Sequence, residues 1–381
     1  MLIEVNGVNF ANKGAELMLH AVLQKVRCAL PDTSLAMAPS GGHDYEKRAR
    51  LGLYQKVRLQ KGGISLGWMV PLRRRQRYRR LYGIVLDEDV DVVLDASGFM
   101  YSDQWGEGPS VAMASSVKAW KKRGTKVILL PQAMGPFTSR AIREAFVFIV
   151  QNADLVFPRD SVSCKHVVDL VGERDNVQQS PDFTVLVSGI TPDNPARYQG
   201  RFCLIPNCRM MDKTSEKESN LYPSFCASCI RYLTESGNKP FILIHEGVDD
   251  QRLAERIVRE SREEIEIVTE TDPLRIKGIL GLCAGVVGSR FHGLVSALSQ
   301  GVPALASGWS HKYKMLFEEY GIPEGCLPVT TEPETLQTRL AWIANGDTRR
   351  ELSARIAEVA ATYRRQTEMM WQRVLAVIAN R

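Results

Sequence analysis

The sequence lacks several features that would place it in a specialised class of protein. Although 44% of its 381 residues are hydrophobic, no apolar run approaches the ~20 residues that a helix needs to span a bilayer. The stretch from Met1 to Gly7 carries an acidic residue where a secretory signal peptide would have basic ones. We therefore expect a cytoplasmic protein that begins with a buried strand, Leu2 to Val5.

A recognisable metal-binding pattern is also missing. The eight cysteines are scattered through the chain, as is usual for reduced thiols in a reducing compartment. Cys226 and Cys229 form a C-x-x-C pair, and Cys203 and Cys208 precede them, but no histidine lies nearby to complete a standard zinc pattern. We therefore predict buried cysteines and no metal site.

A dinucleotide-binding G-x-G-x-x-G is absent as well. The first strand is followed instead by a polar loop rich in Gly and Asn, from Asn6 to Gly14, and by an amphipathic helix from Ala15 to Ala29. Such a loop brings backbone N–H groups close to a ligand.

Strands and helices alternate along the rest of the chain, which predicts mainly parallel sheets. A linker-like stretch rich in Pro, Gly and Asn, residues 184–198, separates two such series. The sequence therefore predicts an α/β protein with two Rossmann-like domains facing a cleft, residues 1–190 and 199–381.

One motif stands out in the second half of the chain. An apolar strand, Gly285 to Val287, ends in Gly288 and Ser289 and is followed by Arg290 and His292 at the start of a helix. Ligands of open α/β sheets bind at this edge. Arg290 suits a carboxylate or a phosphate, and His292 can deliver a proton near neutral pH. A structural ion pair and a helix cap are the alternatives.

A dense basic cluster, Arg73 to Arg80, accounts for much of the net charge of +6. We favour an acidic surface as its partner, such as the inner face of a membrane, over nucleic acid. A solvated face of a helix or loop with no partner is the alternative.

Several segments together resemble the polysaccharide pyruvyl transferase family. They are the Ser289–Gly293 block, residues 309–313 with Lys312, residues 13–16, residues 131–136, residues 159–163 and residues 180–182. The chain departs from the family pattern at Gly14-Ala15-Glu16, where a Gly-Asp is usual, and at Ser97-Gly98, where a glycine pair is usual.

The resemblance implies a GT-B-like transferase. Such an enzyme moves a pyruvyl group from phosphoenolpyruvate to the hydroxyls of a free or lipid-linked saccharide. The product is a cyclic ketal of surface-polysaccharide biosynthesis, and no cofactor is needed besides the donor substrate. The first domain would face the acceptor and the second the donor.

The site residues follow from this chemistry. His292 would be the general acid and Asp95 the base, although Asp95 is also placed to cap a turn. The predicted donor-binding residues are Ser289, Arg290, Phe291, His311, Lys312 and one of Arg159 and Arg209. The predicted acceptor-binding residues are Asn9, Asn12, Lys13, Ser97 and Gln132.

Two other classes of function stay open. A GT-B glycosyltransferase would need a ribose-binding acid in the second domain, and Glu246 or Asp249 could serve. A non-catalytic saccharide-binding protein is the other class, but it needs no proton donor such as His292.

Overall fold

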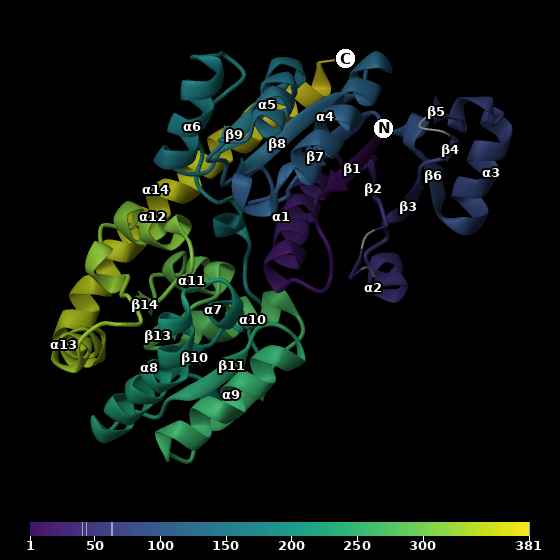
Figure 1. The fold of residues 1–381 in the computed structure, drawn as a ribbon. Coiled ribbons are helices and arrows are strands. Elements are labelled where there is room, and N and C mark those ends of the chain that lie inside the picture. Colours follow the sequence, from purple (N-terminus) through teal and green to yellow (C-terminus); the bar gives the residue numbers. More distant parts are fainter. Residues whose placement is uncertain (40, 43, 62–63, 381) are drawn as a thin grey trace. The chain divides into compact units, whose positions relative to one another are not determined.

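The computed structural model describes residues 1–39, 41–42, 44–61 and 64–380. The chain forms two units, each built around a parallel sheet with helices (Figure 1). Unit 1 comprises Met1–Phe183 and Gln366–Arg381, and unit 2 comprises Thr184–Arg365. The predicted fold class, two Rossmann-like domains with mainly parallel sheets, is confirmed.

Unit 1 contains a seven-stranded sheet in the order β6-β3-β2-β1-β7-β8-β9 among the described residues. Every neighbouring pair in it is parallel. The strands are β1 (Leu2–Asn6), β2 (Ser34–Met37), β3 (Tyr54–Val57), β6 (Ile84–Leu86), β7 (Val92–Asp95), β8 (Lys126–Gln132) and β9 (Leu155–Pro158). A short hairpin, β4 (Gln60–Lys61) with β5 (Ile64–Ser65), lies outside this sheet. The helices are α1 (Lys13–Ala29), α2 (Tyr45–Arg50), α3 (Leu72–Tyr82), α4 (Glu107–Lys122), α5 (Arg140–Asn152) and α6 (Ser161–Val171).

Unit 2 contains a five-stranded sheet in the order β12-β11-β10-β13-β14, again with parallel neighbours. The strands are β10 (Phe202–Ile205), β11 (Phe241–Ile244), β12 (Glu266–Thr269), β13 (Gly285–Gly288) and β14 (Ala304–Ala306). The helices are α7 (Arg209–Asp212), α8 (Glu216–Glu235), α9 (Gly247–Ser261), α10 (Pro273–Leu282), α11 (Phe291–Leu298), α12 (His311–Glu319) and α13 (Pro333–Ala344).

The last helix, α14 (Gly346–Ala379), carries residues of both units. The sequence prediction placed all of residues 199–381 in the second domain, and the structure corrects this for residues 366–381. These residues pack in unit 1, where buried Trp371 meets the ring of Phe183 edge-on and Lys25 pairs with Glu368 at 2.5 Å. The apolar pattern of a helix shows which of its faces is buried, but it does not show which of the two domains that face packs against.

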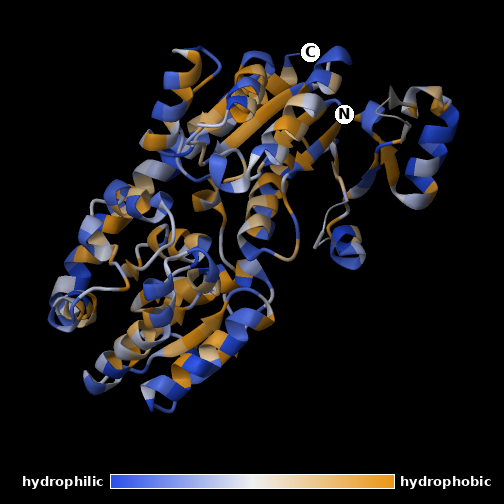
Figure 2. Cartoon of the chain, in the orientation of Figure 1, coloured by the Kyte–Doolittle hydropathy of each residue, from blue (hydrophilic) through white to orange (hydrophobic). Residues whose placement is uncertain are grey.

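The core of each unit lies on its sheet. The strands are apolar and the exposed faces of the helices are polar (Figure 2). Strands buried on both faces read as continuous runs of Val, Ile and Leu, as in β8 and β11. In the described part of the chain, no helix is long and apolar enough to cross a membrane.

Candidate functional site

Both sheets reverse their strand order once, and polar residues gather at each reversal. In unit 1 the reversal lies between β1 and β7, whose last residues, Asn6 and Asp95, are register partners. In unit 2 it lies between β10 and β13, and Ile205 there pairs with Gly288. Open α/β sheets bind their ligands at the carboxyl ends of the strands at such points.

Asp95 is the centre of the unit 1 cluster. Its side chain is fully buried, and both carboxyl oxygens accept hydrogen bonds. Asn6 Nδ2 and Ser97 Oγ donate to Oδ1, each at 2.7 Å. Tyr101 Oη at 3.1 Å and Gln132 Nε2 at 2.8 Å donate to Oδ2. Asp95 therefore holds four polar side chains from three parts of the sheet edge in fixed positions.

The accessible members of this cluster are Asn6 and Ser97, which are only partly buried. Burial raises the pKa of Asp95 above its ordinary value, and the hydrogen bonds from Gln132, Ser97 and Asn6 oppose that shift. Of the two accessible residues, Ser97 presents a hydroxyl that donates directly to the carboxylate.

A close backbone approach holds Ser97 in place. Gly7 adopts a φ of +78°, and a Cβ there would lie 2.2 Å from Ser97 Oγ. Only glycine fits both the conformation and the space.

The remaining predicted acceptor residues stabilise the first loop. Asn9 Oδ1 accepts hydrogen bonds from the backbone N–H groups of Ala11 and Asn12. The side chain of Asn12 caps α1 by accepting from Ala15 N at 2.9 Å. Lys13 is buried and pairs with Glu16 at 2.7 Å. The structure gives all three local structural contacts and does not place them at Asp95.

Arg290 is the centre of the unit 2 cluster. Its guanidinium is buried, with Nε 3.0 Å and Nη2 2.6 Å from the carboxylate of Asp250, and with Nη1 bonded to Glu246. Although burial disfavours the charged form, Glu246 and Asp250 raise the pKa of Arg290. Each guanidinium nitrogen therefore has a carboxylate partner, which differs from the predicted direct contact with an anionic donor.

The pKa of Glu246 is raised above its ordinary value, because the effect of burial on this carboxyl exceeds the opposing attraction of Arg290. Asp250 is fully buried on α9 and accepts a hydrogen bond from Cys208 N at 2.9 Å. Asp249, which we considered as a ribose-binding acid, is exposed and lies 3.4 Å from Arg252.

The loops that follow β13 and β14 lie side by side, since these strands are register partners. The carbonyl of Ser289 accepts hydrogen bonds from Asn207 Nδ2 at 2.7 Å and Tyr313 Oη at 2.8 Å. A Cβ on Gly308 would lie 2.1 Å from Cγ of Tyr313. The glycine therefore allows the tyrosine to link the two loops.

Aromatic rings and basic groups lie close together at the starts of α11 and α12, the helices that follow these two loops. The Lys312 ammonium lies 4.8 Å from the ring centroid of Trp309, 5.3 Å from that of Phe291 and 5.6 Å from that of Tyr313. The His292 ring meets Phe291 edge-on at 5.4 Å. His292, His311 and Lys312 are partly accessible. The structure thus brings together the predicted donor residues Ser289, Arg290, Phe291, His292, His311 and Lys312.

The two arginines left as alternatives lie elsewhere. Arg159 directly follows β9 in unit 1, where it is buried 3.3 Å from Asp182. Arg209 starts α7 in unit 2, is half exposed and pairs with Asp212 at 2.6 Å. Of the two, Arg209 belongs to the unit that carries the predicted donor residues.

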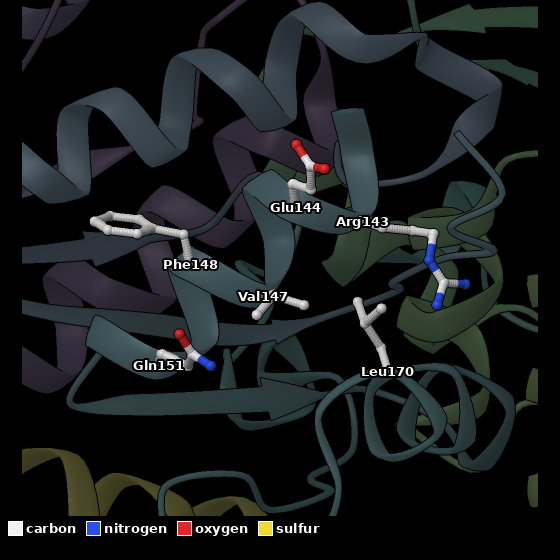
Figure 3. A pocket seen from close by; sticks show the side chains of 6 residues that line it. All are labelled: Arg143, Glu144, Val147, Phe148, Gln151 and Leu170. Atoms are coloured by element: carbon white, nitrogen blue, oxygen red, sulfur yellow. The ribbon is translucent and has the colours of Figure 1, made fainter. Parts of the chain in front are cut away.

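Among the described residues, no cluster of His, Cys, Asp or Glu could hold a metal ion. An open hollow of about 430 Å³ lies between α5 and α6 (Figure 3). None of the predicted site residues lines it; its lining residues are Arg143, Glu144, Val147, Phe148, Gln151 and Leu170.

Comparison with protein families decides the relationship. Residues 12–311 match the model of the polysaccharide pyruvyl transferase family, a span that includes Asp95 and Arg290, the centres of the two clusters. The chain belongs to the polysaccharide pyruvyl transferase family. It is therefore a transferase, as the sequence predicted.

Solved structures show the same fold. An Anabaena protein, Alr3699/HepE, in complex with UDP and glucose is 12% identical with a TM-score of 0.59, covering 100% of this chain and 99% of that one. MnaA of S. aureus with UDP is 12% identical, with a TM-score of 0.59 and coverages of 99% and 96%. UDP-GlcNAc 2-epimerase from Neisseria meningitidis bound to UDP-GlcNAc is 9% identical, with a TM-score of 0.58 and coverages of 98% and 99%. At these identities the comparison shows that the chain shares the fold of these proteins.

Sequence reasoning missed several residues that shape the two clusters. Tyr101 and Asn6 donate to Asp95, and Asn207 and Tyr313 fix the carbonyl of Ser289. For the pairing of Asp250 with Arg290, the sequence contained one indication, the spacing between Glu246 and Asp250. Asp250 lies four residues after Glu246 and one turn into a helix, so both carboxylates face the same side.

Proposed function

We propose that this pyruvyl transferase takes its pyruvyl group from phosphoenolpyruvate and joins it to two hydroxyls of a saccharide as a cyclic ketal. The observation that carries the proposal is the arrangement of the two loops that start α11 and α12. They bring His292, His311 and Lys312 to one edge of the unit 2 sheet.

The charge of the donor suits this edge. Phosphoenolpyruvate carries a carboxylate and a phosphate, which favour cations and helix N-termini. Neither Arg290 nor Ser310 caps its helix with a side-chain hydrogen bond. The first backbone N–H groups of α11 and α12 are therefore not satisfied by their own N-cap side chains, and Lys312 adds a full positive charge beside them.

Arg290 has a different part in this proposal from the one that the sequence motif suggested. Asp250 and Glu246 offset the positive charge of Arg290, so an anion gains little from direct contact with it. Arg290 acts as a positioning residue: its bidentate pair with Asp250 fixes the start of α11, from which His292 extends.

The chemistry requires a proton donor for the methylene carbon of the enol ether. His292 gives its proton to that carbon, and C2 becomes an oxocarbenium-like centre that a sugar hydroxyl attacks. The C2–O bond to phosphate then breaks, phosphate leaves, and a second hydroxyl attacks C2. Over one turnover, the two protons lost by the hydroxyls balance the one that His292 gives to carbon and the one that leaves with phosphate; a base holds a hydroxyl proton only in passing.

In unit 1, we assign Asp95 as the base and Ser97 as the group through which it receives a proton. Asp95 is fully buried, whereas the Ser97 hydroxyl is partly accessible and donates to it at 2.7 Å. A saccharide hydroxyl bound at Ser97 would pass its proton along this hydrogen bond.

The donor is tested by thermal unfolding with phosphoenolpyruvate and, separately, with UDP-glucose. A ligand that binds the folded state raises the melting temperature by mass action. We expect phosphoenolpyruvate to raise it and Lys312→Gln to weaken the effect. Stabilisation by UDP-glucose with none by millimolar phosphoenolpyruvate would favour a glycosyltransferase.

A further inference from the structure

One surface of unit 1 lies outside both clusters and combines exposed apolar side chains with unpaired arginines. It consists of the short 3-10 helix η1 (Gly67–Met69) and α3, and we call it the α3 surface. α3 packs beside β6, the edge strand of the sheet. No residue of α3 is buried, which is unusual for a helix that covers a sheet.

The apolar side chains lie at both ends of α3. Trp68 is 69% exposed, Met69 62% and Leu72 59% at its start, and Leu81 is 51% and Tyr82 62% exposed at its end. Soluble proteins often expose single apolar residues, but five large ones within one short segment favour an interaction surface.

The arginines divide into two sets. Arg75 and Arg79 hold the helix against the unit, through Asp89 at 2.7 Å and through Ser34 and the ring of Tyr54. The second set is exposed and has no ion pair with any described residue: Arg73, Arg74, Arg77 and Arg80. From Leu66 to Gly83 the sequence contains six arginines and no acidic residue, so nothing within the segment neutralises this charge. Figure 2 shows α3 largely in the colour of hydrophilic residues.

The combination fits an anionic lipid surface. Arginines are attracted by negative headgroups, while Trp and Tyr side chains settle at the level of the headgroups and Leu and Met enter the acyl boundary. A soluble polyanion would use the arginines and gain little from Met69 and Leu72. We propose that the α3 surface docks the protein on a membrane that contains anionic lipid.

The test measures binding of the full chain to vesicles of phosphatidylcholine, with and without anionic phosphatidylglycerol, and needs neither donor nor acceptor. We expect binding only to the anionic vesicles. Each arginine near such a surface strengthens binding about fivefold, so Arg74→Gln/Arg77→Gln should weaken it about 25-fold. The change should leave the fold intact, because neither side chain packs in unit 1.

A matched control removes the same charge elsewhere in unit 1. Arg143 and Arg174 are exposed and lie on the β9 side of unit 1, whereas α3 packs on β6, at the opposite edge of the seven-stranded sheet. Arg143→Gln/Arg174→Gln should therefore bind the vesicles within about twofold of the unmodified chain, because the width of the sheet exceeds the screening length of ~10 Å. If both double variants lose affinity equally, vesicle binding depends on the net charge of the protein and not on the α3 surface, and the proposal is overturned.

Trp68→Ser separates a membrane from a soluble polyanion. It should weaken binding to anionic vesicles and leave binding to heparin unchanged. No binding to anionic vesicles, or vesicle binding that Trp68→Ser does not alter, contradicts membrane docking. Because the reaction is not involved, these results are independent of the proposed donor.

Discussion

Asp95 combines complete burial with four hydrogen-bond donors, and its protonation should be visible in stability. Burial raises its pKa in the folded protein above the ordinary value. The folded state therefore holds the proton more tightly than the unfolded state. The stability that this group contributes is present below its ordinary pKa of ~3.9 and is lost as pH rises through the raised pKa.

Asp95→Asn removes this titration. The free energy of unfolding of the unmodified protein minus that of the variant should therefore decrease as pH rises above ~4. Chemical denaturation across a pH series measures the difference. A difference that stays constant with pH, or one that grows in favour of the unmodified protein, contradicts a raised pKa.

Ser97 provides the accessible end of the Asp95 cluster. Ser97→Ala removes the hydroxyl that donates to Asp95, so turnover should fall by ~10²-fold if a proton passes through it. Binding of phosphoenolpyruvate, measured by calorimetry, should stay unchanged. Ser115→Ala on α4 is the control, because that exposed hydroxyl donates to the carbonyl of Val111 in the same helix and is not part of the Asp95 cluster. A Ser97→Ala variant with full turnover would remove the proposed proton path.

His292 carries the proposed acid chemistry. His292→Asn keeps a hydrogen-bonding side chain of similar size but cannot deliver a proton at neutral pH. Turnover should fall ~10²–10⁴-fold, while the affinity for phosphoenolpyruvate should change little. If the rate is retained, the acid lies elsewhere, and His311 at the start of α12 is the first residue to examine.

At the scale of elements, the loop between β14 and α12 depends on a glycine. A Cβ at Gly308 would overlap Tyr313, so Gly308→Ala should displace that ring and break its hydrogen bond to Ser289. We expect a loss of ~1–3 kcal/mol in the free energy of unfolding, as for other overpacked positions.

The matched substitution is Gly108→Ala within α4, where a Cβ meets nothing within 4 Å. Alanine there should stabilise the protein by ~0.5–1 kcal/mol because it restricts the unfolded chain. Equal effects of the two substitutions in urea denaturation would contradict the packing argument for Gly308.

The elements that the sequence predicted well are the long apolar strands. β1 and β13 begin at Leu2 and Gly285, the starts that the sequence predicted. β8 and β11 contain continuous runs of Val, Ile, Leu and Phe. The short strands β3 and β6 gave no such signal. β3 contains Lys56, which is buried between Glu4 at 2.6 Å and Asp87 at 3.0 Å, and a buried lysine looks like a surface residue in a sequence.

In the candidate site too, the sequence predicted some features and the fold alone shows the others. The sequence placed the motif from Ser289 to His292 directly after an apolar strand, and in the structure it follows β13 and starts α11. The carboxylates around Arg290 are those of Glu246, just before α9, and Asp250 within it, about forty residues earlier in the chain. Their spacing indicated a shared side, but only the fold reveals that they face Arg290. Sequence spacing therefore located the cluster but gave Arg290 a contact that the structure assigns to Asp250.

At the scale of the whole chain, the end of α14 belongs to the core of unit 1. Trp371 is 1% exposed and meets Phe183 edge-on. Trp371→Ala should therefore destabilise unit 1 by ~3–5 kcal/mol, seen as an earlier unfolding transition of that unit in calorimetry. Met369→Ala, at a side chain 63% exposed, should leave the transition in place. Matching shifts in the two variants would show that the end of α14 is not part of the core.

The central claim is that phosphoenolpyruvate is the donor and a saccharide the acceptor. The most direct measurement follows phosphate release from phosphoenolpyruvate, and UDP release from UDP-glucose, with a panel of methyl hexosides as acceptors. The account predicts saccharide-dependent phosphate release that is lost in His292→Asn, together with a product heavier than the acceptor by one pyruvyl ketal. Saccharide-dependent release of UDP without release of phosphate would contradict it.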